Sequence, residues 1–174
     1  MARLTTNMLT IACFLAVLRL VTCWMQSPNV TKCPRSEFRF VEIGGVTIGN
    51  AKIGLKMTVD AHVHVLRPIG SYPVLEVYVD SKSGKPLPCF HHYLPDELKL
   101  CHGTTVMEQT LSDEWRNRCP IRSGLHTGHI AFKLPRTRST EKCIGNGRLV
   151  FTLKIRDEGY IFDCVKFPVE IELD

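Results

Sequence analysis

The 174-residue sequence lacks the short motifs on which many enzyme active sites are built. It contains no Gly-x-Ser-x-Gly elbow, no His-Glu-x-x-His pair and no glycine-rich loop that could cradle a phosphate. Gly44-Gly45 and Gly145-Asn146-Gly147 are too sparse for nucleotide binding and predict turns instead. We therefore expect a protein that is not an enzyme and that needs no cofactor.

Metal-binding and nucleic-acid-binding patterns are also missing. No Cys-x-x-Cys pair occurs, which argues against a zinc ribbon or a thioredoxin-type redox site. His62 and His64 would share one face of a strand, but no cysteine or acidic triplet accompanies them at ligand spacing, so no metal site is expected. Because the chain has no dense Lys/Arg tract, we expect no nucleic-acid partner.

The longest apolar run extends from Met8 to Leu18. A membrane-spanning helix needs about 20 apolar residues, so this run is too short to cross a bilayer. Arg3 is the one charge that precedes it, and this arrangement is typical of a signal peptide. Cleavage is expected after Cys23, with a cut after Ser27 as the alternative.

The domain organisation follows from this segment. Residues 1–23 are predicted to be a signal peptide and residues 24–174 a single domain, as the length suggests. Loss of Arg3 and Arg19 turns 22 basic residues into 20 against 17 acidic ones, so the formal charge falls from +5 to +3. We expect a secreted protein of the extracellular space or endolysosomal lumen, whose mildly basic surface favours contact with an anionic membrane surface.

An even set of cysteines remains after cleavage. In a secreted chain six cysteines predict three disulfides, and spacing alone leaves all 15 connectivities open. The sequon Asn29-Val30-Thr31 lies just past the expected cut, so Asn29 is a predicted glycosylation site. The six cysteines are Cys33, Cys89, Cys101, Cys119, Cys143 and Cys164.

Apolar and polar residues alternate along much of the chain, and this period of two predicts half-buried β-strands. The longest alternation runs over residues 51–65, and Asp157-Glu158-Gly159 predicts a hairpin. Helical periodicity is absent apart from a short helical turn expected over residues 95–100. Further strands are predicted over residues 38–43, 75–80, 130–134, 149–155 and 165–171. The pattern indicates an all-β fold, a two-sheet antiparallel β-sandwich.

The order of several short motifs resembles that of the ML (lipid-recognition) domain superfamily. The upstream motifs are most similar to the branch that contains the ganglioside activator and the Niemann-Pick type C cholesterol carrier. The resemblance covers residues 33–173. The motifs are Leu66-Arg67-Pro68, Leu87-Pro88-Cys89, Cys119-Pro120-Ile121, Lys133-Leu134-Pro135, Asp157-Glu158-Gly159, and Cys164 ahead of Phe167-Pro168-Val169-Glu170-Ile171.

The resemblance implies a disulfide-bonded, immunoglobulin-like β-cup whose sheets splay around an internal lipid cavity. It implies that Cys33 pairs with Cys164 and Cys101 with Cys119, which leaves Cys89 for Cys143. Cys143 has no counterpart in the family, so the pairing of Cys89 with Cys101 and Cys119 with Cys143 stays open.

The resemblance also turns the apolar strand faces into the expected cavity wall. The implied lining residues are Ile53, Leu55, Met57, Val59, Val63, Val77, Val79, Phe132, Phe151, Leu153, Val165 and Phe167. Aromatic and basic side chains suit loops that touch a membrane at the cavity rim. The rim candidates are Phe90, Tyr93, Trp115, Arg116 and Arg118.

The implied function is that of a secreted or endolysosomal, non-enzymatic lipid-binding and transfer protein. It would hold acyl chains or a sterol between its sheets and present them to a membrane, an enzyme or a receptor. The expected ligand is a glycolipid, phospholipid, fatty acid or sterol. The alternative is a secreted immunoglobulin-like protein-interaction module with a solid core. An enclosed apolar volume of roughly several hundred cubic ångströms would distinguish the first function from the second.

Overall fold

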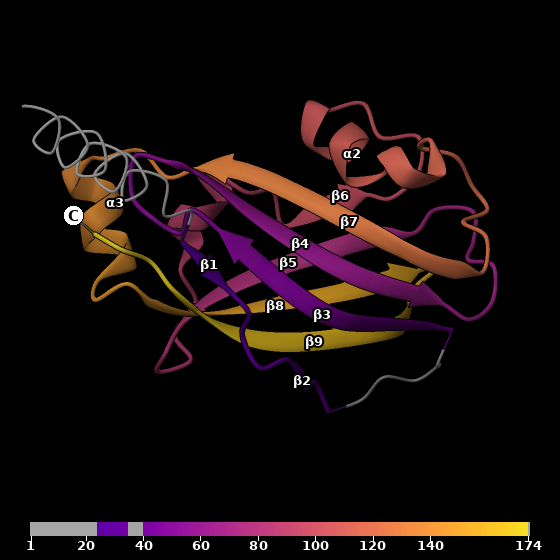
Figure 1. The fold of residues 1–174 in the computed structure, drawn as a ribbon, viewed down its shortest axis with the longest axis horizontal. Helices are drawn as coiled ribbons and strands as arrows, with labels where there is room; N and C mark the ends of the chain where they lie inside the picture. Colours follow the sequence, from indigo (N-terminus) through magenta and orange to yellow (C-terminus); the bar gives the residue numbers. More distant parts are fainter. Residues whose placement is uncertain (1–23, 35–39, 174) are drawn as a thin grey trace, which may run out of the picture.

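The computed structural model describes residues 24–34 and 40–173, so the predicted signal peptide lies outside the described residues. Two antiparallel sheets face each other (Figure 1), with strand orders β1-β3-β4-β7 and β2-β9-β8-β5-β6. The all-β, two-sheet antiparallel sandwich is therefore confirmed. The strands are β1 (Met25–Gln26), β2 (Thr31–Lys32), β3 (Val41–Gly49), β4 (Lys56–Val65), β5 (Val74–Ser81), β6 (Glu97–Lys99), β7 (Gly124–Lys133), β8 (Arg148–Asp157) and β9 (Tyr160–Glu170).

The long central strands form because every second side chain is apolar and faces the other sheet. In β8, Leu149, Phe151, Leu153 and Ile155 are all buried. Phe151 lies opposite Phe167 of β9 in the strand register, and their rings stack with centroids 6.0 Å apart. Burial of each such side chain contributes roughly 1.5–3 kcal/mol, so these faces dominate the stability of the sandwich.

The predicted hairpin joins β8 to β9. Glu158 and Gly159 both have positive φ angles, 48° and 88°. Positive φ at both central residues is the geometry of a type I′ turn, whose twist matches that of the antiparallel strands that it joins. Asp157 and Tyr160 pair directly across it, which confirms the hairpin.

The alternation over residues 51–65 is a strand only from Lys56 onward. The preceding residues form a turn in which Gly54 has a φ of +87° and the Leu55 amide donates to the Lys52 carbonyl at 3.2 Å. The turn breaks the period of two, and Leu55 is 47% exposed. Its predicted place on the inner face is therefore wrong.

Three other local predictions also differ from the structure. Residues 95–100 contain strand β6 instead of a helical turn, because buried Leu98 pairs with Leu75 of β5. Gly44-Gly45 lies inside β3, at an irregularity of the β3–β4 register, and is not a turn between elements. Two short α-helices, α2 (Val106–Leu111) and α3 (Arg138–Ile144), were not predicted, since neither is long enough to show helical periodicity.

Each short helix is linked to one of the three disulfides. Figure 1 shows α2 toward one end of the sandwich and α3 at the other. The Cys101–Cys119 disulfide closes the segment that holds α2 and the 3₁₀ helix η2 (Asp113–Trp115), and Cys89–Cys143 joins the 3₁₀ helix η1 (Pro88–His92) to α3. Cys33–Cys164 fastens the chain after β2 to β9. These are the three pairs that the resemblance implies.

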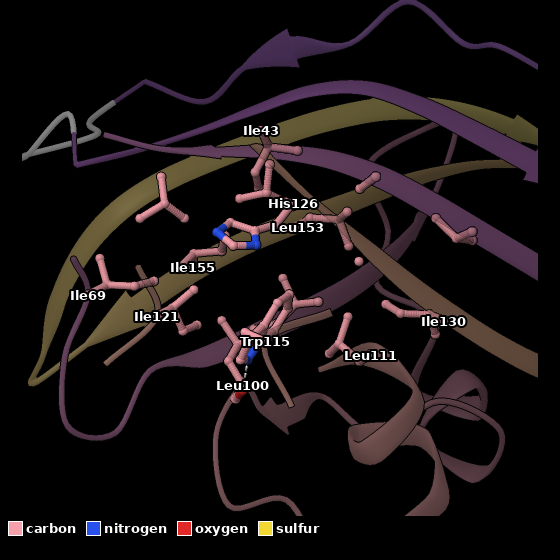
Figure 2. Close-up of a pocket in the computed structure, with 16 residues that line it drawn as sticks. Ile43, Ile69, Leu100, Leu111, Trp115, Ile121, His126, Ile130, Leu153 and Ile155 are labelled. Carbon is pink, nitrogen blue, oxygen red and sulfur yellow. Dashed lines mark hydrogen bonds between the residues drawn. The ribbon is translucent and has the colours of Figure 1, made fainter. Parts of the chain in front are cut away.

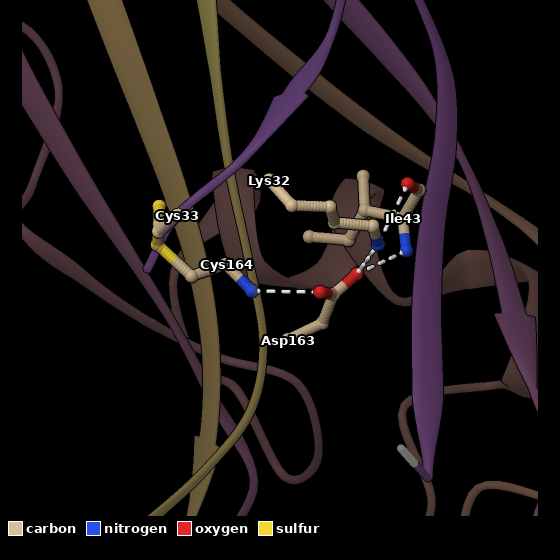
Figure 3. A network of polar contacts seen from close by, with 5 residues as sticks. All are labelled: Lys32, Cys33, Ile43, Asp163 and Cys164. Carbon is tan, nitrogen blue, oxygen red and sulfur yellow. Dashed lines mark hydrogen bonds and ion pairs between the residues drawn. A yellow bond between two sulfur atoms is a disulfide. The ribbon is translucent and has the colours of Figure 1, made fainter. Parts of the chain in front are cut away.

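One buried carboxylate links the two sheets (Figure 3). Asp163 of β9 is 2% exposed and accepts hydrogen bonds from the backbone amides of Ile43 at 2.6 Å and Cys164 at 2.9 Å. Its other contact is an ion pair with Lys32 at 2.5 Å. Because Ile43 belongs to β3 of the opposite sheet, this carboxylate joins β3 to β9.

Candidate functional site

An apolar pocket lies between the two sheets at the α2 end of the sandwich (Figure 2). Its volume is about 40 Å³. Apart from two aromatic rings, its lining is aliphatic or glycine. The residues that line it are Ile43, Val59, Ala61, Val63, Val65, Ile69, Leu75, Leu100, Leu111, Trp115, Ile121, His126, Gly128, Ile130, Leu153 and Ile155.

Two small residues help to create this space. Ala61 of β4 and Gly128 of β7 are direct partners in the strand register, and both line the pocket. A β-carbon at Gly128 would lie 3.1 Å from Leu111 Cδ1, closer than ordinary contact, so glycine lets α2 approach β7. Larger side chains at this pair of positions would occupy the pocket.

The pocket is closed on the α2 side by residues 101–119, which we call the covering segment. Figure 2 shows Leu111 and Trp115 on this side of the pocket. Trp115 Nε1 donates to the Leu100 carbonyl at 2.5 Å. The Asn117 side chain bonds to both the amide and the carbonyl of Gly103, at 2.8 and 2.9 Å. With its disulfide, the covering segment is thus cross-linked within itself.

Glu108 organises the start of α2. Its buried carboxylate accepts hydrogen bonds from the backbone amides of Lys99, Thr104 and Thr105, and the Thr105 hydroxyl completes a capping box. Burial alone would raise the pKa of Glu108, but these hydrogen bonds to its charged form outweigh burial and lower it below the usual 4.5.

Acid should therefore loosen the covering segment. Since the pKa of Glu108 is lower in the folded state, its stabilisation is present above about pH 4.5 and is lost as the pH falls through the folded value. Glu108→Gln should lower stability by about 2 kcal/mol at pH 7, as loss of a strong cap does, and make the decline below pH 4.5 shallower. Thermal melts from pH 3 to 7 measure both effects. Glu42→Gln, at an exposed carboxylate, is the control and should leave the pH 7 melting temperature unchanged.

The mouth of the pocket is marked by its three lining residues that are not buried: Val63, Trp115 and His126. The Trp115 and His126 rings meet edge to face with centroids 5.7 Å apart. His126 Nε2 donates to the Arg122 carbonyl at 2.9 Å, and Nδ1 lies 3.6 Å from a Glu114 oxygen. His126 therefore contacts both the covering segment and the chain that leads into β7.

Three of the predicted cavity residues, Val59, Val63 and Leu153, line this pocket. Leu55 is exposed, as described above. The other predicted residues lie in the packed core outside the pocket: Ile53, Met57, Val77, Val79, Phe132, Phe151, Val165 and Phe167. Aromatic rings fill part of this core, because Phe151 contacts both Phe90 and Phe167.

The rim candidates separate into two groups. Trp115 lines the pocket, and Arg116 and Arg118 are exposed beside it. Phe90 is 2% exposed and packs on Phe151, so its predicted contact with a membrane is wrong. Tyr93 is half-buried, with its hydroxyl 3.0 Å from that of Thr140 in α3, and so lies away from the pocket.

Asn29, the predicted glycosylation site, is exposed between β1 and β2. In the described ranges 24–34 and 40–173, no three His, Cys, Asp or Glu side chains gather so as to hold a metal ion. No helix in the same ranges is long and apolar enough to cross a membrane.

The chain was compared with known proteins by sequence and by structure. No protein-family model matches it, and no curated protein matches its sequence. Among solved structures, the C-terminal domain of wzt has a TM-score of 0.45 and 9% identity, covering 84% of this chain and 78% of that one. A Niemann-Pick type C2 protein from Japanese carpenter ant has a TM-score of 0.41 and 13% identity, covering 85% of this chain and 91% of that one.

The fold and the pocket define a structural class by themselves. The chain is a disulfide-linked antiparallel β-sandwich with an apolar pocket between its sheets, at the end where a cross-linked segment covers them.

Proposed function

We propose that the protein is a secreted, non-enzymatic lipid-binding protein that takes the apolar tail of a lipid into the pocket between its sheets. The observation that carries this proposal is the aliphatic lining of the pocket together with its mouth at Val63, Trp115 and His126. Such a wall suits a hydrocarbon tail, because burial of each methylene contributes about 0.8 kcal/mol without any directional partner. Delivery to a membrane, an enzyme or a receptor belongs to the same proposal.

A lipid tail must widen the pocket. Ligand pockets commonly have volumes of about 300–1,000 Å³, whereas this pocket has about 40 Å³. The covering segment is attached to β7 by the Glu114 carboxylate, which accepts the Thr127 amide, and by Leu111 against Gly128. Because β7 is an edge strand, moving the covering segment away from it breaks no strand pairing. We propose that the tail enters by displacing this segment.

The small volume also favours a second candidate, a protein-interaction module with a filled core. Most of the space between the sheets is packed by the core side chains, and such a core needs no ligand. The two candidates differ in one measurable property. A lipid-binding protein changes at Trp115 when a lipid is added, whereas an interaction module does not.

The chain contains two tryptophans, Trp24 and Trp115, which makes this test direct. In a Trp24→Phe variant the fluorescence comes from Trp115 at the pocket mouth. Titration with palmitate, hexadecanol and cholesterol should produce a saturable change in emission with one site for at least one ligand. The Trp115→Phe variant, which keeps Trp24, is the control and should show no such change. If no ligand produces a saturable signal, the proposal fails and the interaction module is favoured.

A further inference from the structure

A hollow on the protein surface adjoins the pocket mouth. Its volume is about 560 Å³, and we call it the vestibule. Cys119 also contributes to its wall, so the Cys101–Cys119 disulfide anchors the backbone on which the vestibule is built. Its principal side chains are Glu114, Trp115, Arg116, Arg118, Arg122 and His126.

The vestibule and the pocket share two walls. Trp115 and His126 line both, and both are residues of the pocket mouth. A molecule with its tail in the pocket would pass these two rings, and its other end would then lie in the vestibule. The pocket is aliphatic, whereas the vestibule is polar and charged. An amphiphile, with an apolar tail and a polar head group, matches these two adjoining environments.

The charge of the vestibule is positive. Its lining contains three arginines and one glutamate, and the Glu114 carboxylate already accepts a hydrogen bond from the Thr127 amide. Arg116, Arg118 and Arg122 are exposed, and none forms an ion pair with another described residue. Their guanidinium groups are therefore available to an anion, and their planar shape suits two-point contact with carboxylate or phosphate oxygens.

The backbone that carries two of these arginines is fixed within the covering segment. Asn117 lies between Arg116 and Arg118, and its side chain bonds to both polar backbone groups of Gly103. Arg116 and Asn117 adopt left-handed backbone angles, φ 55° and 54°. The arginines thus extend from a fixed turn, which lowers the entropy lost when they hold a ligand.

We propose that the ligand is an anionic amphiphile with one apolar tail, whose carboxylate or phosphate head group is held in the vestibule by Arg116, Arg118 and Arg122. This inference rests on the proposed function and adds the chemical class of the ligand. It assigns the arginines to the ligand itself instead of to a membrane surface.

The test compares two ligands with the same sixteen-carbon tail, palmitate and uncharged hexadecanol, by Trp115 fluorescence in the Trp24→Phe background at pH 7.4. Palmitate should bind at least tenfold more tightly than hexadecanol. The combined variant Arg116→Gln, Arg118→Gln and Arg122→Gln should lose at least tenfold in palmitate affinity and less than twofold in hexadecanol affinity. Palmitoyl lysophosphatidic acid, with a phosphate head on the same tail, should show the same loss as palmitate.

A matched control removes the same number of charges at the α3 end of the molecule. The combined variant Arg136→Gln, Arg138→Gln and Lys142→Gln should keep its affinity for palmitate within twofold. All of these positions are exposed, so both combined variants should keep the parent melting temperature.

Four results would overturn the inference. Equal affinities for palmitate and hexadecanol, or equal losses in the two combined variants, would show that the vestibule arginines do not read the head group. If the combined variant of Arg116, Arg118 and Arg122 lost binding to phosphatidylserine vesicles but kept its palmitate affinity, the arginines would be assigned to contact with a membrane. If neither sixteen-carbon ligand binds, this inference fails; if cholesterol does not bind either, the proposed function fails with it, an outcome distinct from equal binding.

Discussion

Ala61→Leu should reduce palmitate affinity at least tenfold. The larger side chain extends from β4 into the pocket opposite Gly128. It would occupy the volume of about 40 Å³ into which a tail must first insert. Overpacking costs typically about 1–3 kcal/mol, so the fold should persist while the site is lost. Affinity is measured by Trp115 fluorescence and stability by urea unfolding.

Ala131→Leu is the matched control for this substitution. Ala131 lies on the outer face of β7, between the buried residues Ile130 and Phe132. The substitution therefore places the same larger side chain outside the pocket. Its palmitate affinity should stay within twofold of the parent. If Ala61→Leu binds palmitate as tightly as Ala131→Leu does, the ligand does not use the pocket between the sheets.

Asp163→Ala should lower the free energy of unfolding by about 3 kcal/mol. The substitution leaves the amides of Ile43 and Cys164 without their acceptor inside the protein, and each unsatisfied buried donor costs about 1–3 kcal/mol. It also removes the partner of Lys32, although that side chain is half-exposed and reaches water. Urea unfolding monitored by circular dichroism gives the value.

The comparison variant is Glu172→Ala, which removes the ion pair of Glu172 with Lys52 at 2.5 Å. Both of those side chains are partly exposed, so the pair should contribute at most about 1 kcal/mol. Equal losses in the two variants would show that the Asp163 network does not join the sheets as the structure indicates.

Alternation along the sequence predicted the long strands well. Leu149, Phe151, Leu153 and Ile155 of β8 alternate along the strand and are buried, as are Val165, Phe167 and Val169 of β9. The hairpin predicted from Asp157-Glu158-Gly159 joins the two strands. Such features depend on neighbouring residues, so they can be seen in a single sequence. The sandwich follows from them.

The covering segment could not be predicted in this way. Its fold depends on the Cys101–Cys119 disulfide and on Glu108, which reaches Lys99 in another element. These contacts join residues that no short periodic pattern connects. Strand β6 was missed for a similar reason, since three residues are too few to show alternation.

The pocket depends on details of register that alternation does not contain. All inner-face residues of β4 and β8 have the same pattern, yet only some line the pocket. What distinguishes its location is the pairing of Ala61 with Gly128, which a sequence shows only when the register of β4 and β7 is known. Toward α3, Phe90 and Phe151 fill the corresponding space, and this is why Phe90 is a core residue and not a rim residue.

The most direct test of the central claim is a search for nuclear Overhauser effects between the hydrocarbon tail of bound palmitate and methyl groups of the protein. We predict contacts to the pocket methyls of Val59, Ala61 and Leu153, and none to exposed Leu125 on the outside. Contacts confined to exposed methyls such as those of Leu125 would contradict the claim that this sandwich holds a lipid tail between its sheets. The absence of contacts to the pocket methyls at a saturating palmitate concentration would also contradict it.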